Sequence, residues 1–546
     1  MDSKRADFTR PVNLSAATGT GPVRHEIPAY VTLTPPCAAA CPAGENIREW
    51  LAEAQAGNYR RAWEILTADN PMPAVHGRVC YHPCEGGCNR GDIDAPVSIH
   101  AIERFLGDMA NAEGWAFTPI AAPTGKRVLV VGAGPSGLSA AYHLARLGHS
   151  VEIREAGPVA GGMMHFGIPA YRMPRAELAR DVARIEALGV KITLNHKVTD
   201  LEAERVDGRF DAVYLAIGAG AGKHVDIPAK EAPKILDAVN LLAETSKGTP
   251  PLLGRRVVVY GGGNTAMDAA RTAKRLGATE TLIVYRRDRD HMPAHDFEAD
   301  EAMAEGVKIK WLTTIKEIDG AALTVERMEI GADGRARPTG EFDTLEADAL
   351  VLALGQETDS GFLRHVKGLT FSWNNTVEVD DQMMTGAEGV FAGGDMTPAE
   401  QSVTIATGHG KKAARHIDAW LKGRRYEAAD PPALVTADML HLPVYSDNQQ
   451  QEQAALDLAR REGTFDEVLG GIDARAARYE AARCYSCGAC YECDNCFAAC
   501  PEDAIAKQGA GQGYTIDPDR CTGCRSCFDQ CPCHALEMIA EETADV

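Results

Sequence analysis

The chain has 546 residues, of which 45% are hydrophobic and 24% are charged, and its formal net charge is −21. At roughly 100–200 residues per domain, this length predicts three to five domains. An acidic chain without a basic block is not expected to bind nucleic acid or an anionic membrane; it suits a protein partner with a positive docking face. Because we find neither an apolar leader nor a long apolar run, we expect a cytoplasmic protein without membrane insertion.

The 16 cysteines lie near the two ends of the chain, five between residues 37 and 88 and eleven between 484 and 533. Short, fixed spacings in a large chain without an export signal indicate metal ligands rather than disulfides. Residues 1–35 lack an apolar period and predict an extended arm, whereas residues 45–110 predict helices interrupted by cysteine-bearing loops. The first set is Cys37, Cys41, Cys80, Cys84 and Cys88.

A βαβ pattern follows from residue 126 to 155, with the glycine turn GAGPSG at 132–137. Gly132 permits the tight turn, Gly134 lets the backbone approach a pyrophosphate, and Gly137 lets the helix pack on the strand. Glu155 ends the second strand, where an acid binds a ribose. The pattern predicts a dinucleotide site; the alternative is an unliganded α/β domain. The expected contacts here are Gly132, Gly134, Pro135, Ser136, Gly137 and Glu155.

The same pattern recurs from residue 255 to 287, with the turn GGGNTA at 261–266. Its second strand ends in Arg286 and Arg287 instead of an acid. Because guanidinium groups bind a 2′-phosphate in bidentate fashion, these arginines favour NADP over NAD. The alternatives are a solvated rim or a contact with the adenine of NAD. The expected contacts are Gly261, Gly263, Asn264, Thr265, Arg286 and Arg287.

Two dinucleotide folds in one chain predict FAD in the first and NAD(P) in the second. The segment VFAGGD at 390–395 resembles the ribitol-binding segment of two-dinucleotide-fold flavoproteins. The chain has no cysteine from 89 to 483, which excludes a redox disulfide beside the flavin, so electrons must leave by another route. The further expected contacts are Gly162, Gly167, Ile168, Gly218, Gly394, Asp395 and Thr404 to FAD, and Gly355 to NAD(P).

The C-terminal cysteines form two runs of the spacing C-x2-C-x2-C-x3-C-P. This is the signature of bacterial two-cluster ferredoxins, in which the fourth cysteine of each run binds the other cluster. Zinc is the alternative, but tetrahedral zinc sites rarely use this repeat. We therefore expect one 4Fe-4S cluster on Cys490, Cys493, Cys496 and Cys531, and another on Cys521, Cys524, Cys527 and Cys500.

From about residue 30 to 425 the chain resembles the small subunit of glutamate synthase and the electron-entry half of dihydropyrimidine dehydrogenase. The resembling stretches are PCAAACPAG at 36–44, NP at 70–71, GRVC at 77–80, CEGGCNR at 84–90, GGMMHFGIP at 161–169 and YRR-x4-HMP at 285–293. The resemblance implies that Cys41, Cys80, Cys84 and Cys88 bind a 4Fe-4S cluster.

The family normally has a second N-terminal cluster, whose first two ligands form a Cys-x-x-Cys shortly before the position of Cys37. This sequence has VTLTPP at 31–36 instead, so Cys37 is left over, as are Cys484 and Cys487. One hypothesis is that Cys484 and Cys487 fold back and form a fourth cluster with Cys37 and Glu103. The alternatives are free or packing thiols, or a small zinc site. Cys533 is expected to have no ligand role.

The predicted fold is multidomain, with a helical N-terminal Fe-S domain, two Rossmann-like α/β dinucleotide-binding domains and a C-terminal α+β ferredoxin domain. The expected segments are an extended arm (1–35), a helical 4Fe-4S domain (36–120), a first FAD-binding segment (121–248), the NAD(P)-binding domain (249–375), a second FAD-binding segment (376–428), a linker (429–480) and the two-cluster ferredoxin domain (481–546).

These features predict an FAD-dependent NAD(P)H:acceptor oxidoreductase subunit with three or four 4Fe-4S clusters. No catalytic side chain is expected, because hydride passes between cofactors. The terminal repeat resembles that of flavoprotein subunits serving 2-oxoacid oxidoreductases such as phenylglyoxylate dehydrogenase, which makes such an enzyme the expected partner. The alternatives are a glutamate-synthase-type partner, soluble ferredoxin, a sulfite-reductase-type acceptor and, in another class, a non-catalytic electron-wiring subunit.

Overall fold

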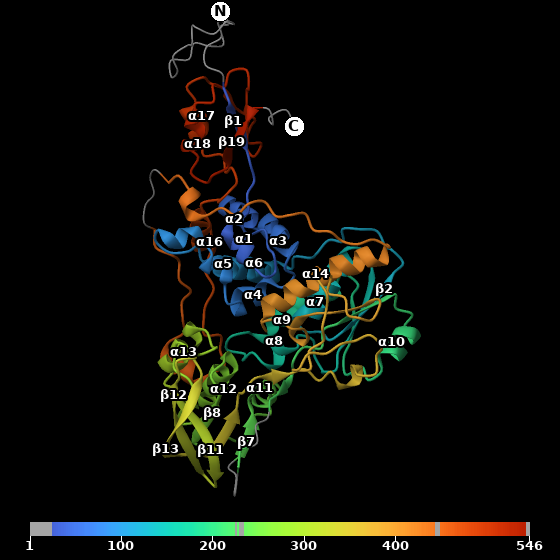
Figure 1. Ribbon diagram of the computed structural model, residues 1–546, viewed down its shortest axis with the longest axis vertical. Coiled ribbons are helices and arrows are strands. Elements are labelled where there is room, and N and C mark those ends of the chain that lie inside the picture. The colour runs from blue at the N-terminus through green and yellow to red at the C-terminus, as the bar shows by residue number, and fades with distance from the viewer. Residues whose placement is uncertain (1–23, 224–226, 229–233, 443–447, 542–546) are drawn as a thin grey trace, which may run out of the picture.

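The computed structural model describes residues 24–223, 227–228, 234–442 and 448–541. The molecule is elongated, with the ferredoxin unit at one end, a helical domain in the middle and the second nucleotide unit at the other end (Figure 1). The predicted multidomain class is confirmed by this architecture. Residues 1–23 of the expected extended arm lie outside the described residues.

The helical domain has two buried tryptophans, Trp50 and Trp63, in its core. Helices α4 and α6 cross at two glycines. A Cβ atom on Gly77 would lie 2.4 Å from the backbone N of Arg104, and one on Gly107 would lie 2.3 Å from that of Ala74, so only glycine permits this crossing. The elements are α1 Pro36–Ala40, α2 Ile47–Ala56, α3 Tyr59–Thr67, α4 Pro73–Val79, α5 Pro83–Gly86, η2 Asn89–Asp92 and α6 Ile99–Glu113.

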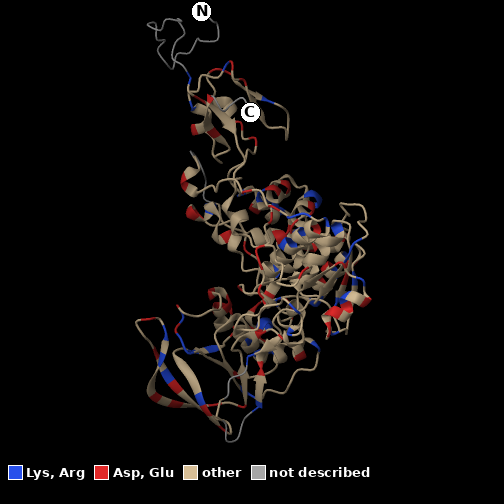
Figure 2. Cartoon of the chain, turned by 45° about the vertical axis from the view of Figure 1, so that its right-hand side comes forward, with Lys and Arg blue, Asp and Glu red and all other residues tan. Residues whose placement is uncertain are grey.

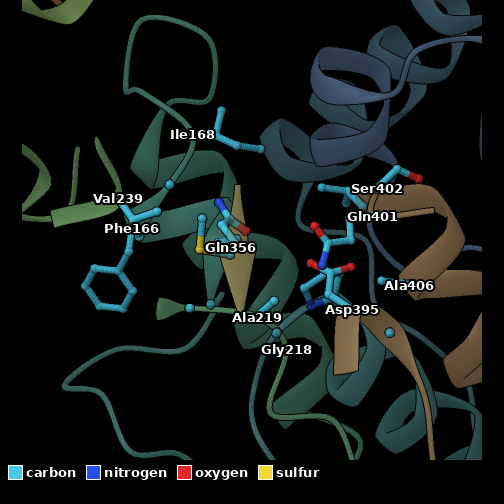
Figure 3. Close-up of a pocket in the computed structure, with 18 of the residues that line it drawn as sticks. Phe166, Ile168, Gly218, Ala219, Val239, Gln356, Asp395, Gln401, Ser402 and Ala406 are labelled. Carbon is cyan, nitrogen blue, oxygen red and sulfur yellow. The ribbon is translucent and has the colours of Figure 1, made fainter. Parts of the chain in front are cut away.

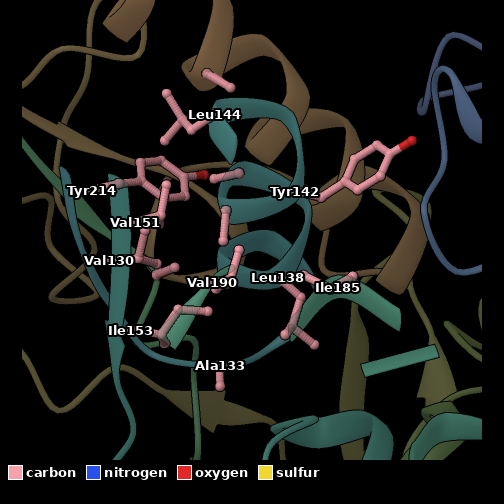
Figure 4. Packing of buried hydrophobic residues seen from close by; sticks show 14 of the residues in the cluster. Val130, Ala133, Leu138, Tyr142, Leu144, Val151, Ile153, Ile185, Val190 and Tyr214 are labelled. Carbon is pink, nitrogen blue, oxygen red and sulfur yellow. The ribbon is translucent and has the colours of Figure 1, made fainter. Parts of the chain in front are cut away.

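The first nucleotide unit is a parallel sheet of order β16-β5-β2-β3-β4. Helix α7 packs on this sheet in a core cluster that includes Val130, Ile153 and Tyr214, whereas Tyr142 lies on the opposite side of the helix and donates to the carbonyl of Thr67 (Figure 4). The elements are β2 Arg127–Val131, α7 Pro135–Arg146, β3 Ser150–Arg154, α8 Met163–Phe166, α9 Arg175–Glu186, β4 Lys191–Thr193, α10 Leu201–Asp207, β5 Ala212–Leu215, β16 Val390–Ala392, η4 Gly394–Met396 and α14 Val403–Leu421.

The second nucleotide unit repeats this design, with the parallel order β10-β9-β8-β14-β7. Beside it lies an antiparallel sheet, β11-β12-β13, which carries both acidic and basic residues (Figure 2); Lys316 and Glu326 form an ion pair across it. The elements are β6 Ala221–Gly222, β7 Lys234–Asp237, α11 Ala238–Ser246, β8 Arg256–Tyr260, α12 Asn264–Arg275, β9 Glu280–Val284, α13 Asp296–Ala304, β10 Lys308–Lys310, β11 Thr313–Asp319, β12 Ala322–Ile330, β13 Ala336–Glu346, β14 Ala349–Leu352, β15 Gln356–Glu357 and η3 Gly361–Leu363.

The ferredoxin unit contains a strand from the other end of the chain. Strand β1 (Glu26–Tyr30) pairs antiparallel with β19 (Leu536–Ala540) along its whole length. The segment between α14 and the ferredoxin unit packs against other parts of the molecule. Its Leu434 forms a β-bridge with Thr34, and the backbone N–H of its Val468 donates to the carbonyl of Tyr171. The remaining elements are η5 Ala437–Met439, α15 Leu458–Gly463, α16 Ala474–Ala482, α17 Asn495–Ala499, β17 Ile505–Lys507, β18 Tyr514–Ile516 and α18 Ser526–Asp529. Of the helices in the described residues, none has the length and apolar character needed to span a bilayer.

Candidate cofactor sites

A cavity of about 700 Å³ lies between the two nucleotide units and receives both glycine loops. Its walls also include Val79 and Tyr81 of the helical domain. A single chamber therefore contacts both nucleotide units and the helical domain. The predicted cofactor residues that line it are Gly132, Gly134, Pro135, Ser136, Glu155, Gly162, Gly167, Ile168, Gly218, Gly263, Asn264, Thr265, Gly355, Gly394 and Asp395. Gly137, Thr404, Gly261, Arg286 and Arg287 are not among the lining residues.

The first loop needs its glycines for two different reasons. Gly132 has φ +104°, and a Cβ there would lie 2.3 Å from the carbonyl oxygen of Ala216. Gly137 is pressed against the turn itself, because its Cβ would lie 2.0 Å from the oxygen of Gly132. Gly134, in contrast, faces open space within the cavity wall. The loop therefore fits a pyrophosphate that approaches Gly134 at the N-terminus of α7.

The carboxylate of Glu155 is fixed by backbone amides. It accepts from the N–H of Ala133 at 2.7 Å and from that of Gly157 at 2.6 Å. These bonds hold the side chain at the edge of the cavity, where the sequence predicts a ribose contact. Ser136 bonds the Tyr214 hydroxyl at 2.6 Å, which fixes the start of α7 against the sheet.

The second loop contacts the helical domain directly. The side-chain amide of Asn264 donates to the hydroxyl of Tyr81 at 2.6 Å, and its carbonyl accepts from the backbone N–H of His295 at 3.0 Å. The rings of Tyr81 and His295 stack at 3.8 Å between centroids. Burial raises the pKa of Tyr81 to about 12, so its hydroxyl is protonated at neutral pH. Tyr81 adjoins the predicted ligand Cys80, and sequence reasoning missed it.

Arg286 and Arg287 follow β9, at the carboxyl edge of the second sheet. Arg286 is exposed and Arg287 is half-buried. The Nε of Arg287 is buried and has no hydrogen-bond partner in the described residues of the chain. An unpaired buried donor at this edge fits an anionic ligand.

Asp395 lies at the N-terminal side of α14 and faces the cavity beside Gln401 and Ser402 (Figure 3). Within the described residues, its carboxylate has no hydrogen bond. Burial raises the pKa of Asp395 to about 6. A half-buried carboxylate without a partner is costly unless a ligand supplies donors. The hydroxyls of a ribitol chain are such donors, so the residues here fit FAD.

Helix α14 joins the flavin unit to the helical domain. The hydroxyl of Thr404 bonds the sulfur of Cys80, although burial is the larger effect and raises the pKa of that thiol to about 12. Gly408 approaches the loop after Cys41 so closely that a Cβ would lie 2.1 Å from the oxygen of Pro42. Thr404, expected at the flavin, thus lies against Cys80, a predicted cluster ligand.

The structure groups the N-terminal cysteines differently from our sequence assignment. Cys41 and Cys80 interact electrostatically with Glu103, and Cys84 interacts with both of these cysteines. The carboxylate of Glu103 accepts from the side chain of Asn70 at 2.8 Å. Burial raises the pKa of Glu103 well above its usual range. Glu103 therefore belongs with this cysteine group and not with Cys37.

Cys88 lies in a separate small cavity with Cys37, Cys484 and Cys487. The resemblance implied one group of Cys41, Cys80, Cys84 and Cys88, whereas the structure places Cys88 beside Cys37, Cys484 and Cys487. Helix α5 turns the chain between Cys84 and Cys88. Gly87 then lies against Pro36, with its Cβ position 3.2 Å from that carbonyl oxygen, which brings Cys88 next to Cys37.

In the ferredoxin unit the structure brings together the two expected sets. Cys500, Cys521, Cys524 and Cys527 line one cavity. Cys490 interacts electrostatically with Cys493, Cys496 and Cys531. Tyr30 of β1 bonds the sulfur of Cys496 at 3.2 Å. No local signal could have found Tyr30, since the contact joins residues 466 positions apart.

Three family models match the chain. The pyridine nucleotide-disulphide oxidoreductase model matches residues 126–410. The model of dihydropyrimidine dehydrogenase domain II, with its 4Fe-4S cluster, matches residues 29–115. The 4Fe-4S dicluster domain model matches residues 489–535.

Several curated proteins are similar over most of the chain. The beta subunit of an NADP(+)-dependent formate dehydrogenase from Moorella thermoacetica is 35% identical over 83% of this chain and 71% of its own length. The beta subunit of an NADPH-Fe(3+) oxidoreductase from Geobacter sulfurreducens is 34% identical over 83% and 75%. The glutamate synthase [NADPH] small chain of Halomonas elongata is 32% identical over 70% and 87%.

Proposed function

The chain belongs to the pyridine nucleotide-disulphide oxidoreductase family, and on that premise we propose that it transfers electrons between NADP(H) and the substrate-bearing subunit of a larger oxidoreductase. One observation carries the proposal. The same cavity is lined by both dinucleotide loops and by Tyr81, the neighbour of a predicted cluster ligand. When bound, FAD would accept hydride from the nucleotide and release electrons singly to the clusters.

The protein's own residues bind and orient the cofactors. Gly134 and Gly263 leave space for two pyrophosphates at the N-termini of α7 and α12. Asp395 would accept from the flavin's ribitol, and Tyr81 would hold the second loop against the helical domain through Asn264. Cys41, Cys80, Cys84 and Glu103 would hold one cluster, and the two cysteine sets of the ferredoxin unit would hold two more, which would supply one-electron transfer to the partner.

We infer NADP(H) rather than NAD(H) from the two arginines after β9. The buried Nε of Arg287 has no hydrogen-bond acceptor among the described residues, and a 2′-phosphate would supply one. The names of the three relatives above specify NADP or NADPH, in agreement with this choice.

The partner is proposed from chemistry and similarity. The sequence favours a 2-oxoacid oxidoreductase. The relatives' names support the glutamate-synthase-type alternative and add a formate dehydrogenase and an NADPH-Fe(3+) oxidoreductase to the candidates. Purification of the tagged chain at native expression, followed by mass spectrometry of what accompanies it, distinguishes them. Recovery of the chain without any oxidoreductase subunit would contradict a partner of this class.

Anaerobic nucleotide addition tests the enzyme activity. NADPH should bleach the flavin absorbance of the purified protein, and should do so at lower concentration than NADH. A protein whose flavin neither nucleotide bleaches would be a non-catalytic wiring subunit, and the proposal would be wrong.

The arginines give the first mutational prediction. Arg287→Ala should raise the KM for NADPH about tenfold or more and leave that for NADH nearly unchanged, because one charge-assisted interaction with the phosphate is lost. Arg289→Ala is the matched control, since Arg289 lies on the same loop but pairs with Asp300 at 2.7 Å. Equal effects of Arg287→Ala on both nucleotides would reject the phosphate contact.

A further inference from the structure

We propose that Cys37, Cys88, Cys484 and Cys487 bind a fourth 4Fe-4S cluster, which joins the helical domain to the ferredoxin unit. Its ligands come from opposite ends of the chain. Cys484 and Cys487 fall between the stretches matched by family models, which end at residue 410 and resume at 489. The proposal goes beyond the three clusters invoked above.

The four sulfurs share one small cavity. The rest of its wall includes the apolar side chains of Leu51, Val97 and Ile99. The cavity measures about 20 Å³, the same as the one formed by Cys500, Cys521, Cys524 and Cys527 in the ferredoxin unit. A second site of four cysteines with the same size as a ferredoxin site fits the same kind of ligand.

The backbone of the Cys484 turn repeats the ferredoxin ligand turns. Ser486 has φ +52° and Glu492 has φ +59°, although neither is glycine. The corresponding residue of the second ferredoxin run, Gly523, has φ +69°. In each turn this residue's N–H donates to the sulfur two positions earlier, at 3.4 Å for Cys484, 3.5 Å for Cys490 and 3.4 Å for Cys521. A serine held in the left-handed region costs free energy, and such strain persists at functional sites.

Further donors surround the site. The side-chain amide of Asn89 donates to the sulfur of Cys487 at 3.6 Å. Buried Arg48 donates to the carbonyl oxygens of Leu33 and Cys487, both at 2.8 Å, and so fixes the N-terminal arm to the cysteine turn. A positive side chain and N–H···S bonds stabilise a cluster that carries net negative charge on its thiolates.

The position of the site gives it a role. Cys88 follows Cys84, a ligand of the helical domain's cluster, by four residues, and Cys487 precedes Cys490 of the ferredoxin unit by three. The site is thus flanked along the chain by ligands of a cluster on either side. Electrons that leave the flavin unit through Cys80 would cross it to reach the ferredoxin clusters.

Iron and sulfide analysis of the full chain tests the proposal. The protein should contain about 16 iron atoms, four for each of four cubic clusters. Cys484→Ala should lose about four iron and four sulfide, with one set of EPR signals, and Cys487→Ala should lose the same set. Cys533→Ala is the matched control, because Cys533 is a buried cysteine outside all four ligand groups, and it should lose none.

The outcomes are separable from those of the proposed function. Flavin content and bleaching by NADPH should be retained in Cys484→Ala, which shows that the nucleotide units are folded and active. About 12 iron atoms in the unaltered protein and no change in Cys484→Ala would overturn the fourth cluster. If Cys484→Ala lost one zinc ion and no iron, the fourth cluster would be overturned as well.

Discussion

At the scale of single residues, Tyr30 of β1 forms a hydrogen bond to a cysteine sulfur of the ferredoxin unit. Tyr30 stacks on Tyr514 at 6.2 Å and directs its hydroxyl at Cys496. Burial and that bond raise the pKa of Tyr30, so the hydroxyl stays protonated and donates. Hydrogen bonds to ligand sulfurs raise the reduction potential of a cluster, because they stabilise the more negative reduced state.

Removing this donor should therefore make one cluster harder to reduce. Tyr30→Phe should shift the potential of the cluster on Cys490, Cys493, Cys496 and Cys531 to a more negative value, measured by EPR-monitored redox titration. Tyr514→Phe is the control, since the Tyr514 hydroxyl donates to Asp494 at 2.6 Å and not to sulfur. Equal shifts in the two variants would refute a specific role of the hydroxyl.

Asp395 gives a pH prediction for the flavin-free protein. Its pKa is raised from 3.8 to about 6 by burial. Between these values the folded state keeps a proton that the unfolded state has released, so stability falls as pH rises and levels off above about 6. Asp395→Asn should flatten the decline of the thermal midpoint between about pH 5 and 6. Adding FAD to the unaltered protein should also flatten this decline of the thermal midpoint with pH. If neither Asp395→Asn nor FAD changes the decline, another group causes it.

At the scale of elements, close helix contacts place the cluster ligands. The crossing of α4 and α6 positions Cys80, which follows α4, near Glu103 of α6. Helix α14 extends this arrangement to the flavin unit, because His76 of α4 bonds Thr407 of α14 at 3.0 Å. The glycines at the crossing therefore allow the close approach that places Cys80 beside Glu103.

Adding one methyl group to this crossing should be costly. Gly107→Ala should destabilise the helical domain by about 1–3 kcal/mol, since overpacked contacts force backbone shifts. Gly463→Ala in α15 is the control, because a Cβ there meets nothing within 4 Å. Thermal unfolding followed by far-UV circular dichroism measures both. A Gly107→Ala protein as stable as the control would mean that the crossing relaxes easily.

The elements of the fold that depend on local pattern could be predicted from sequence. Both βαβ units, with Gly132 and Gly261 in their turns, follow from apolar periods and glycine spacing. The grouping of Cys88 could not be predicted, because it depends on the contact of Gly87 with Pro36. Tyr81 was also missed: its role depends on Asn264, 183 residues later.

At the scale of the whole molecule, the electron route is limited by the lack of cysteines in the two nucleotide units. No cysteine lies between residues 89 and 483, so neither nucleotide unit contributes one to a cluster. The helical domain contacts the flavin chamber through Val79 and Tyr81, while the ferredoxin unit lies at the far end of the molecule (Figure 1). The helical domain is therefore the connection between them.

The pairing of β1 with β19 also has a consequence for biosynthesis. Arg24 contacts Glu541, 517 residues later in the chain. At about 5–20 residues per second, a ribosome needs on the order of 25 to 100 s to make the intervening chain. The first strand of the ferredoxin unit must therefore stay unpaired until β19 has been translated. The iron–sulfur sites of this unit cannot be complete before that point, because its last predicted ligand, Cys531, lies only five residues before β19.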